Sequence, residues 1–439
     1  MRFLTTVCAA ALLAPTLASA NELDRLYGLA LENDQVIRAA ASARDAALEA
    51  QPITRGALLP QIGASGSYVQ QDQTFTQKGF PTTKTSGAAT NYGANLSQAL
   101  FDRAAWYRWR QAGNTASLAH VRYRGAEQDL VLRTAVAYFN LLAADDSVRL
   151  ADAQLQALER QLELARKRFE VGLSAITDVQ ETQARYDLAT ATKISADQFL
   201  SSARVAMSYV TGSPDVRVVP LKDEIPLLQP SPAKAPEWQK AAAEGNLDLK
   251  ASEIIAESSD KDIGIATSSH WPTIAAVGGY SKSTGSVQES EVTQYGVQVN
   301  VPLFAGGATQ ARVNSAKSTH EQRLAELEGT RRLTDSNTLI AYQNVLASIA
   351  IVKAQKQAVL SNTTALEASS VGLEVGSRTT VDVLNAQGLL FAAQQTYARS
   401  RYDYLLNHLR LKALTGSLMQ KDLTEIDALL GYGAAPPTK

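Results

Sequence analysis

The sequence predicts a mainly α-helical fold in which long antiparallel coiled-coil hairpins are combined with four β-strands. Three observations predict it. The 439-residue chain contains two related halves, each half has one long stretch without proline, and each half has two segments in which apolar and polar residues alternate. At about 1.5 Å per residue, each proline-free stretch would form a helix about 100 Å long, which exceeds the size of a compact domain.

The first twenty residues have the pattern of a secretory signal peptide. Arg2 precedes an apolar run, and Ala18-Ser19-Ala20 is a small-x-small cleavage site, so we expect residues 1–20 to be removed. The only cysteine, Cys8, lies in this segment, which leaves the mature chain without disulfides. A formal net charge of −1 gives no reason to expect a nucleic-acid partner. Beyond residue 20, no apolar run is long enough to predict a transmembrane helix.

The internal duplication divides the mature chain into two repeats. Tyr92-Gly93 recurs as Tyr295-Gly296, and Thr211-Gly212 recurs as Thr415-Gly416 after one inserted residue. Two copies of about 200 residues indicate gene duplication rather than a solenoid. The predicted domains are a first structural repeat over 21–212, a Pro-rich connector over 213–236, a second structural repeat over 237–416 and a C-terminal tail over 417–439.

Each repeat is predicted to begin with one helical segment followed by two strands. The helical segments cover about 22–55 and 237–268, and each ends just before a proline-marked strand. We expect the loops between the strands, about 71–89 and 282–291, to be polar and flexible. The alternation is clearest in the last strand, where one face would carry Tyr295, Val297, Val299, Val301 and Leu303.

Four strands with one apolar and one polar face leave two interpretations open. In lipid, a four-stranded sheet would expose unpaired edges, and the smallest outer-membrane barrels have about eight strands. Strands in a membrane would therefore require several chains to share one barrel. Alternatively, the strands form a soluble two-hairpin sheet that packs on the helices. The pattern alone favours neither interpretation.

The strands of each repeat are followed by a predicted helical hairpin. Its first helix covers about 104–169 in one repeat and 308–374 in the other, with apolar residues at coiled-coil spacing. Gly172 and Gly376 then interrupt the pattern, where a left-handed residue would end the helix. A second apolar heptad follows each glycine, so each repeat is predicted to end in an antiparallel hairpin.

The residues provide no candidate for catalysis, for a metal site or for a bound cofactor. The four histidines are isolated from one another, and the pair Gly-Lys of a phosphate-binding loop never occurs. Ser258-Ser-Asp-Lys261 matches S-x-x-K, but no partner motif accompanies it. With the extended architecture, this favours a structural or transport role over an enzyme.

Several motifs resemble the TolC family of outer-membrane efflux and secretion channels over essentially the whole mature chain. They are Leu58-Leu-Pro-Gln61, Ala135-Val-Ala-Tyr-Phe-Asn140, Val171-Gly-Leu-Ser-Ala-Ile-Thr-Asp-Val-Gln180, Val301-Pro-Leu-Phe-Ala-Gly-Gly307 and Val375-Gly-Ser-Arg-Thr-Thr-Val-Asp-Val-Leu384. The resemblance implies a homotrimer whose twelve strands close one outer-membrane barrel and whose helices form a periplasmic tunnel. It favours the membrane interpretation of the strands, and the connector and the tail would then lie around the equator of the tunnel.

The resemblance also implies a gate at the helical tips. Arg378 resembles the arginine that holds the tunnel shut by binding the neighbouring turn, where Thr177 and Asp178 match its partners. Asp382 matches a first acidic ring at the constriction. The family's tyrosine in this lock falls on Leu373, and its second acidic ring falls on Asn385, which keeps polarity and loses the charge. Without the resemblance, Arg378 and Asp178 would be ordinary exposed tip charges.

The implied function is a passive channel-tunnel that exports small molecules or proteins. Its implied partners are an inner-membrane transporter of the RND, MFS or ABC type, outer-membrane lipid and a periplasmic adaptor. The adaptor would grip the hairpin tips at Val171, Gly172, Leu173, Val375, Gly376 and Ser377. The alternatives are a periplasmic helical-hairpin adaptor or scaffold and a secreted enzyme on a helical scaffold. An adaptor usually has one hairpin flanked by β domains, an asymmetry that this sequence lacks.

Overall fold

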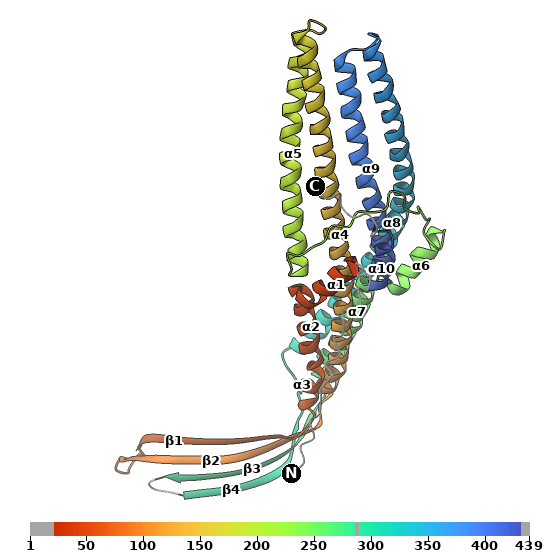
Figure 1. The fold of residues 1–439 in the computed structure, drawn as a ribbon. Coiled ribbons are helices and arrows are strands. Elements are labelled where there is room, and N and C mark those ends of the chain that lie inside the picture. Colours follow the sequence, from red (N-terminus) through yellow and green to blue (C-terminus); the bar gives the residue numbers. More distant parts are fainter. Residues whose placement is uncertain (1–21, 286–288, 432–439) are drawn as a thin grey trace, which may run out of the picture.

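The computed structural model describes residues 22–285 and 289–431, so the expected signal peptide lies outside the described residues. Figure 1 shows an extended molecule in which a column of helices carries a sheet at one end and two helical hairpins at the other. The first half comprises α1 (Glu22–Asn33), α2 (Gln35–Leu48), α3 (Ala50–Gly56), β1 (Gln61–Phe75), β2 (Thr83–Phe101), α4 (Arg103–Glu170) and α5 (Ile176–Thr211). The second half comprises α6 (Ala235–Gly245), α7 (Leu247–Ser268), β3 (Thr273–Gly285), β4 (Glu289–Asn300), α8 (Ala308–Glu374), α9 (Thr380–Leu414) and α10 (Gln420–Asp427).

The two long helices confirm the predicted hairpins. Helices α4 and α8 begin and end within one residue of the expected limits. The absence of proline leaves every backbone hydrogen bond of their interiors possible. In the hairpin half of the column α4 packs on α5 and α9, and α8 packs on α9. Nearer the sheet α4 packs on α2, α3 and α7, and α8 packs on α7.

The helical segments that precede the strands are divided, so the prediction of one continuous helix in each repeat was wrong. Asp34 leaves the helical conformation and caps α2 through bonds from the backbone N–H groups of Val36 and Ile37, at 2.9 and 3.0 Å. Asn246 caps α7 in the same way through the N–H of Leu249, at 2.9 Å. A short polar side chain that accepts from the first turn favours a new helix start over continuation.

The four strands form one antiparallel sheet in the order β1-β2-β3-β4. The central pairing joins the two halves of the chain, with Ala94 opposite Tyr280. Strands β1 and β2 remain paired as far as Phe75 and Thr83, so most of the loop expected over 71–89 is strand. Its threonines suit an extended ladder, which the polar composition concealed.

Strand β4 ends at Asn300, earlier than the alternation up to Leu303 suggested. Pro302 follows closely and has no N–H to donate, so it cannot continue the ladder. The sheet itself extends away from the helices with both faces largely uncovered in the single chain (Figure 1). None of the helices in the described ranges combines the length and the apolar character needed to cross a membrane.

The main hydrophobic core lies at mid-height of the column, where α1, α4, α9 and the connector meet. Tyr138, Phe139 and Tyr402 are its largest fully buried side chains, and the rings of Phe139 and Tyr402 stack at 5.7 Å. The Tyr402 hydroxyl donates to a carboxylate oxygen of Asp146 at 2.6 Å, which joins α9 to α4. Burial therefore raises the pKa of Tyr402, with the Asp146 charge adding to the effect. This core anchors both hairpins at their bases.

Candidate functional site: the hairpin tips

The tips of the two hairpins lie at the end of the column farthest from the sheet (Figure 1). Gly172 and Gly376 have φ of 75° and 77°, the left-handed conformation that the sequence predicted for these positions. After each glycine the backbone closes on the preceding turn. The N–H of Leu173 bonds the carbonyl of Arg168 at 2.7 Å, and that of Ser377 bonds the carbonyl of Gly372 at 2.8 Å. Two equivalent turns are thus presented side by side.

Both turns expose apolar side chains. Val171, Leu173 and Val375 are 68%, 77% and 73% exposed. Gly172, Gly376 and Ser377 are also exposed, so all six predicted tip-contact residues are accessible in the single chain. Exposed apolar residues at the end of a rigid element are typical of a contact surface.

Asp382 has a structural role at the start of α9 that the sequence analysis missed. Its carboxylate accepts from the Thr379 N–H and from the Thr379 hydroxyl, both at 2.9 Å, and Thr379 Oγ1 accepts from the Asp382 N–H at 3.2 Å. This reciprocal arrangement is a capping box, and the pattern Thr379-x-x-Asp382 is a signal that could have identified it. The bond from the Thr379 N–H lowers the pKa of Asp382, and the bond from the Thr379 hydroxyl and the positive charge of Arg378 add to this effect.

Arg378 and its predicted partners do not meet within one chain. Arg378 and Thr177 are exposed and Asp178 is half-buried, and no ion pair joins Arg378 to Asp178 among the described residues. The Arg378 backbone N–H bonds the carbonyl of Gly372 at 3.0 Å, and the stem of the Arg378 side chain lies against Gly372. Leu373 is half-buried beside this turn. A bond between Arg378 and the turn of another chain stays a prediction.

Asn385 makes a contact between the hairpins that the sequence did not predict. Arg185 on α5 donates from Nη2 to Asn385 Oδ1 on α9 at 2.8 Å. Beside it, the buried Leu384 packs against Leu158 and Ala189 of the first hairpin. No repeat or heptad position marks Arg185, because the contact depends on how one hairpin lies against the other.

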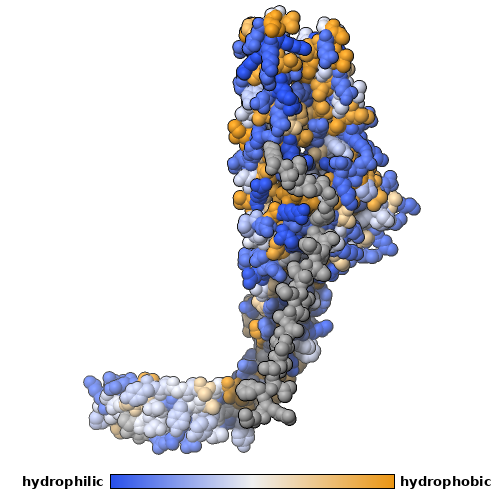
Figure 2. All heavy atoms as spheres, in the orientation of Figure 1, coloured by the Kyte–Doolittle hydropathy of each residue, from blue (hydrophilic) through white to orange (hydrophobic). Residues whose placement is uncertain are grey.

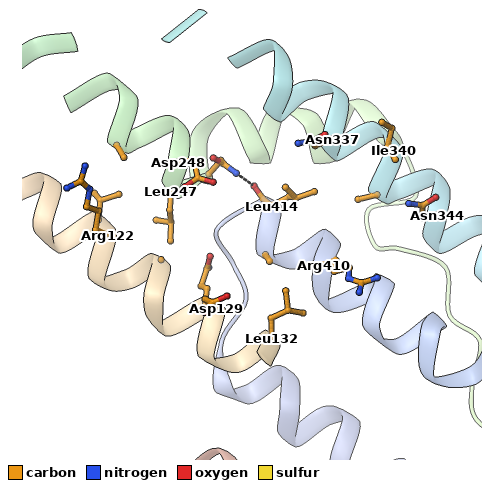
Figure 3. A pocket seen from close by; sticks show the side chains of 17 residues that line it. Arg122, Asp129, Leu132, Leu247, Asp248, Asn337, Ile340, Asn344, Arg410 and Leu414 are labelled. Atoms are coloured by element: carbon orange, nitrogen blue, oxygen red, sulfur yellow. Dashed lines mark hydrogen bonds between the residues drawn. The ribbon is translucent and has the colours of Figure 1, made fainter. Parts of the chain in front are cut away.

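A cavity of about 710 Å³ lies lower in the column, where α4, α7, α8 and α9 meet (Figure 3). Asp129, Asn246, Asn337 and Arg410 are among its lining residues, and Asn246 Nδ2 donates to the carbonyl of Leu414 at 2.9 Å. No group of three or more His, Cys, Asp or Glu side chains in the described ranges could hold a metal ion.

The chain thus has two related halves, two long helical hairpins and one four-stranded sheet. The sequence model of the outer membrane efflux protein family matches residues 26–213 and again 238–417. The chain belongs to this family. It is accordingly an outer-membrane channel-tunnel with its helical part in the periplasm, and it acts as a passive conduit rather than as an enzyme.

Individual relatives extend over nearly the whole chain. The outer membrane protein TolC of Vibrio cholerae is 33% identical, with 93% of this chain and 94% of that protein covered. The alkaline protease secretion protein AprF of Pseudomonas aeruginosa is 30% identical, with 93% and 87% covered. Among solved structures, the outer-membrane channel OprN has a TM-score of 0.79 at 17% identity, with 91% of each chain covered.

The comparisons confirm the predicted fold class. The family's solved channels are trimers with long helical hairpins and a barrel shared between the chains, to which each chain contributes its sheet. Four strands from each of three chains give the twelve expected from the resemblance. The unpaired outer edges of β1 and β4 are the surfaces that such closure requires.

Proposed function

We propose that three copies of this chain form an export channel that receives its cargo at the hairpin tips. A periplasmic adaptor and an inner-membrane transporter of the RND, MFS or ABC type would deliver it. The apolar turns at Val171, Leu173 and Val375 carry the proposal, because these side chains are exposed in the part of the chain that the structure describes and lie farthest from the sheet. Membership of the outer membrane efflux protein family supports export of small molecules, and similarity to the alkaline protease secretion protein AprF supports export of proteins.

The adaptor contact is testable by site-specific crosslinking. If residues 1–20 are removed, the mature chain has no cysteine, so Val171→Cys and Val375→Cys would each introduce a single thiol. In cells of the source bacterium we expect both variants to crosslink to a periplasmic protein through a short thiol–amine reagent. Ser201→Cys, on the exposed side of α5 away from the turn, is the control. Crosslinking confined to the control would contradict contact at the tips.

The proposed gate closes the tip end through Arg378 and the turn of a neighbouring chain that contains Thr177 and Asp178. Reversing the charge in Arg378→Glu should raise the single-channel conductance in planar bilayers, because a pair of like charges repels. Arg160→Glu changes an exposed arginine on α4, below the tip, and should leave the conductance unchanged. A closed conductance that does not respond to Arg378→Glu would refute the gate assignment.

Asp382 is proposed to supply the only acidic ring, since Asn385 occupies the second position. Three carboxylates in a narrow pore favour cations and bind multivalent ones. Block by a trivalent cation should therefore be abolished by Asp382→Ala and strengthened by Asn385→Asp. Block that persists in Asp382→Ala would show that the cation binds elsewhere. Because Asp382 also caps α9, Asp382→Asn serves as the variant that retains part of the cap.

A further inference from the structure

Aromatic and basic side chains gather where the sheet meets the helices. Figure 2 shows apolar side chains at this junction, between the mostly polar sheet surface and the mixed surface of the column. We define the junction collar as residues 52–61, 97–110, 269–275 and 301–312, the segments that connect strands to helices. Trp106, Trp109 and Trp271, three of the four tryptophans of the chain, lie in the collar.

The collar tryptophans are accessible to a surrounding medium. Trp106 and Trp271 are 50% and 47% exposed, and the rings of Trp106 and Trp109 contact each other at 5.1 Å. The fourth tryptophan, Trp238, is buried in the helical column. Tryptophan rings concentrate at membrane–water interfaces, where one edge remains apolar and the N–H remains hydrated.

The collar also carries an excess of positive charge. Its only acidic residue is Asp102, whose carboxylate is occupied in accepting from the Ala105 N–H at 2.9 Å as the cap of α4. Its arginines are Arg55, Arg103, Arg108, Arg110 and Arg312. None of these five forms an ion pair with another described residue, whereas Arg133 and Arg332 higher in the column do.

Arg103 is held among aromatic rings rather than by a carboxylate. Its guanidinium lies 4.9 Å from the ring centroid of Trp271 and 5.5 Å from that of Tyr107. Arg103 Nη2 donates one long bond to the Tyr107 hydroxyl, at 3.4 Å. The other donors of the guanidinium have no partner among the described residues, and its planar fork matches two oxygens of a phosphate. Trp106, Arg108 and Arg110 are exposed on the next turns of α4.

We propose that the junction collar binds the phosphate headgroups of anionic phospholipids at the periplasmic face of the outer membrane. The proposal rests on the proposed channel, whose strands are in the membrane and whose helices are in the periplasm. The collar is continuous with that membrane segment, and its arginines, which form no ion pair with another described residue, complement a negatively charged lipid surface. Tryptophan sets the depth of the chain in the bilayer, and arginine selects lipids by headgroup charge.

The collar tryptophans allow a direct test with the full-length trimer in vesicles. Brominated phosphatidylglycerol or brominated phosphatidylethanolamine would be mixed at equal fractions with its unbrominated counterpart, and quenching of tryptophan fluorescence would be measured. We expect phosphatidylglycerol to be favoured by about fivefold or more, the factor that one surface guanidinium contributes. The preference should fall at high salt, because exposed charges are screened.

The decisive variant is the triple substitution Arg103→Gln, Arg108→Gln and Arg110→Gln, which should make quenching by the two lipids equal. Its matched control is Arg122→Gln, Arg124→Gln and Arg160→Gln, which removes the same charge from exposed positions higher on α4. The control should retain the preference.

Equal quenching in the wild type, or a preference that survives the collar triple, would refute the collar proposal. Absence of quenching by either lipid would show that the collar tryptophans do not lie at the bilayer, which would also refute the collar proposal. The proposed channel would be refuted only if the same trimer conducted no ions across a planar bilayer. If the collar triple does not assemble, Arg108→Gln alone, which changes a side chain without an ion pair, provides the comparison by its reduced preference.

Discussion

The two repeats join the helical hairpin to the helices at its base through different interactions. In each, the returning helix of the hairpin ends at a left-handed glycine, Gly212 or Gly416, and abuts the start of a helix that leads toward the sheet. At the first junction the cap of that helix is Asp34, and at the second it is Asn246. The duplication thus provides an internal control for what holds a hairpin to its base.

At the first junction an ion pair joins α4 to the cap of α2. Arg133 on α4 bonds Asp34 at 2.7 Å, and the Asp34 side chain is only 2% exposed. The position that corresponds to Arg133 in the second repeat, 204 residues later, is Asn337. Asn337 and Asn246 line the cavity of Figure 3, and the junction is joined by the neutral bond from Asn246 to Leu414. The first hairpin is therefore held by an ion pair and the second by a neutral contact beside a cavity.

The largest expected effect comes from adding a methyl group at the second junction. A Cβ at Gly416 would lie 2.1 Å from the carbonyl oxygen of Gly245, and φ there is 68°. Since neither backbone can withdraw, Gly416→Ala should destabilise the protein by about 3 kcal/mol or more. Urea unfolding of the detergent-solubilised trimer, monitored by circular dichroism, measures this loss of unfolding free energy.

The matched change in the first repeat is Gly212→Ala, where the added Cβ would lie 2.6 Å from the Asn33 side chain. The atom met is Asn33 Cβ, which is fixed to its backbone, but the overlap is smaller than the 2.1 Å approach at Gly416, so a smaller loss is expected. Gly388→Ala, in α9 with no atom near the added methyl, is the neutral control. A loss for Gly212→Ala that equals the loss for Gly416→Ala would contradict the difference in junction packing.

Removing the charge at the first junction should have the next largest effect. Asp34→Asn keeps a side-chain oxygen for the cap but weakens the charge-assisted bond with Arg133, at a cost of about 2 kcal/mol. Asp129→Asn removes the exposed second partner of the same arginine and should cost less than about 0.5 kcal/mol. Equal losses for the two variants in urea unfolding would indicate that burial of Asp34 adds nothing.

The same ion pair predicts a difference in pH dependence. The bond from Arg133, with the N–H groups of the α2 cap, lowers the pKa of Asp34 in the folded protein. A carboxyl group whose pKa is lower in the folded than in the unfolded state stabilises the protein above the unfolded-state pKa of about 4. This stabilisation is lost as the pH falls through the folded-state pKa. Wild-type stability should therefore fall more steeply below pH 4 than that of Asp34→Asn. Parallel urea midpoints from pH 6 to pH 2 would contradict this.

A smaller effect than that of Asp34→Asn is expected at the neutral cap of the second junction. Asn246→Ala removes the acceptor for the Leu249 N–H and the donor to Leu414, and should cost about 1 kcal/mol with no pH dependence. Asn246→Asp retains the cap but loses the donor to Leu414. If Asn246→Asp were as stable as the wild type, the bond to Leu414 would not contribute to holding the second hairpin.

Much of the hairpin architecture was predictable from local signals. The limits of α8 and the turn glycines Gly172 and Gly376 follow from the absence of proline, the apolar heptads and the single residue type that tolerates positive φ. The divisions at Asp34 and Asn246 carried a local signal as well, a polar cap residue, but continuous apolar spacing obscured it. The limits of the strands depended on pairing with partners, so composition placed the 71–89 loop wrongly.

The sequence by itself determined the duplicated order of elements, the length of the hairpins and the position of their turns, because each depends on residues close together in the chain. Only the tertiary structure decided that β2 pairs with β3 across the two repeats, that Arg185 meets Asn385, and that Arg133 closes one junction while a cavity flanks the other. These contacts join residues far apart in sequence. Their energies depend on the orientation of whole helices, which no local pattern records.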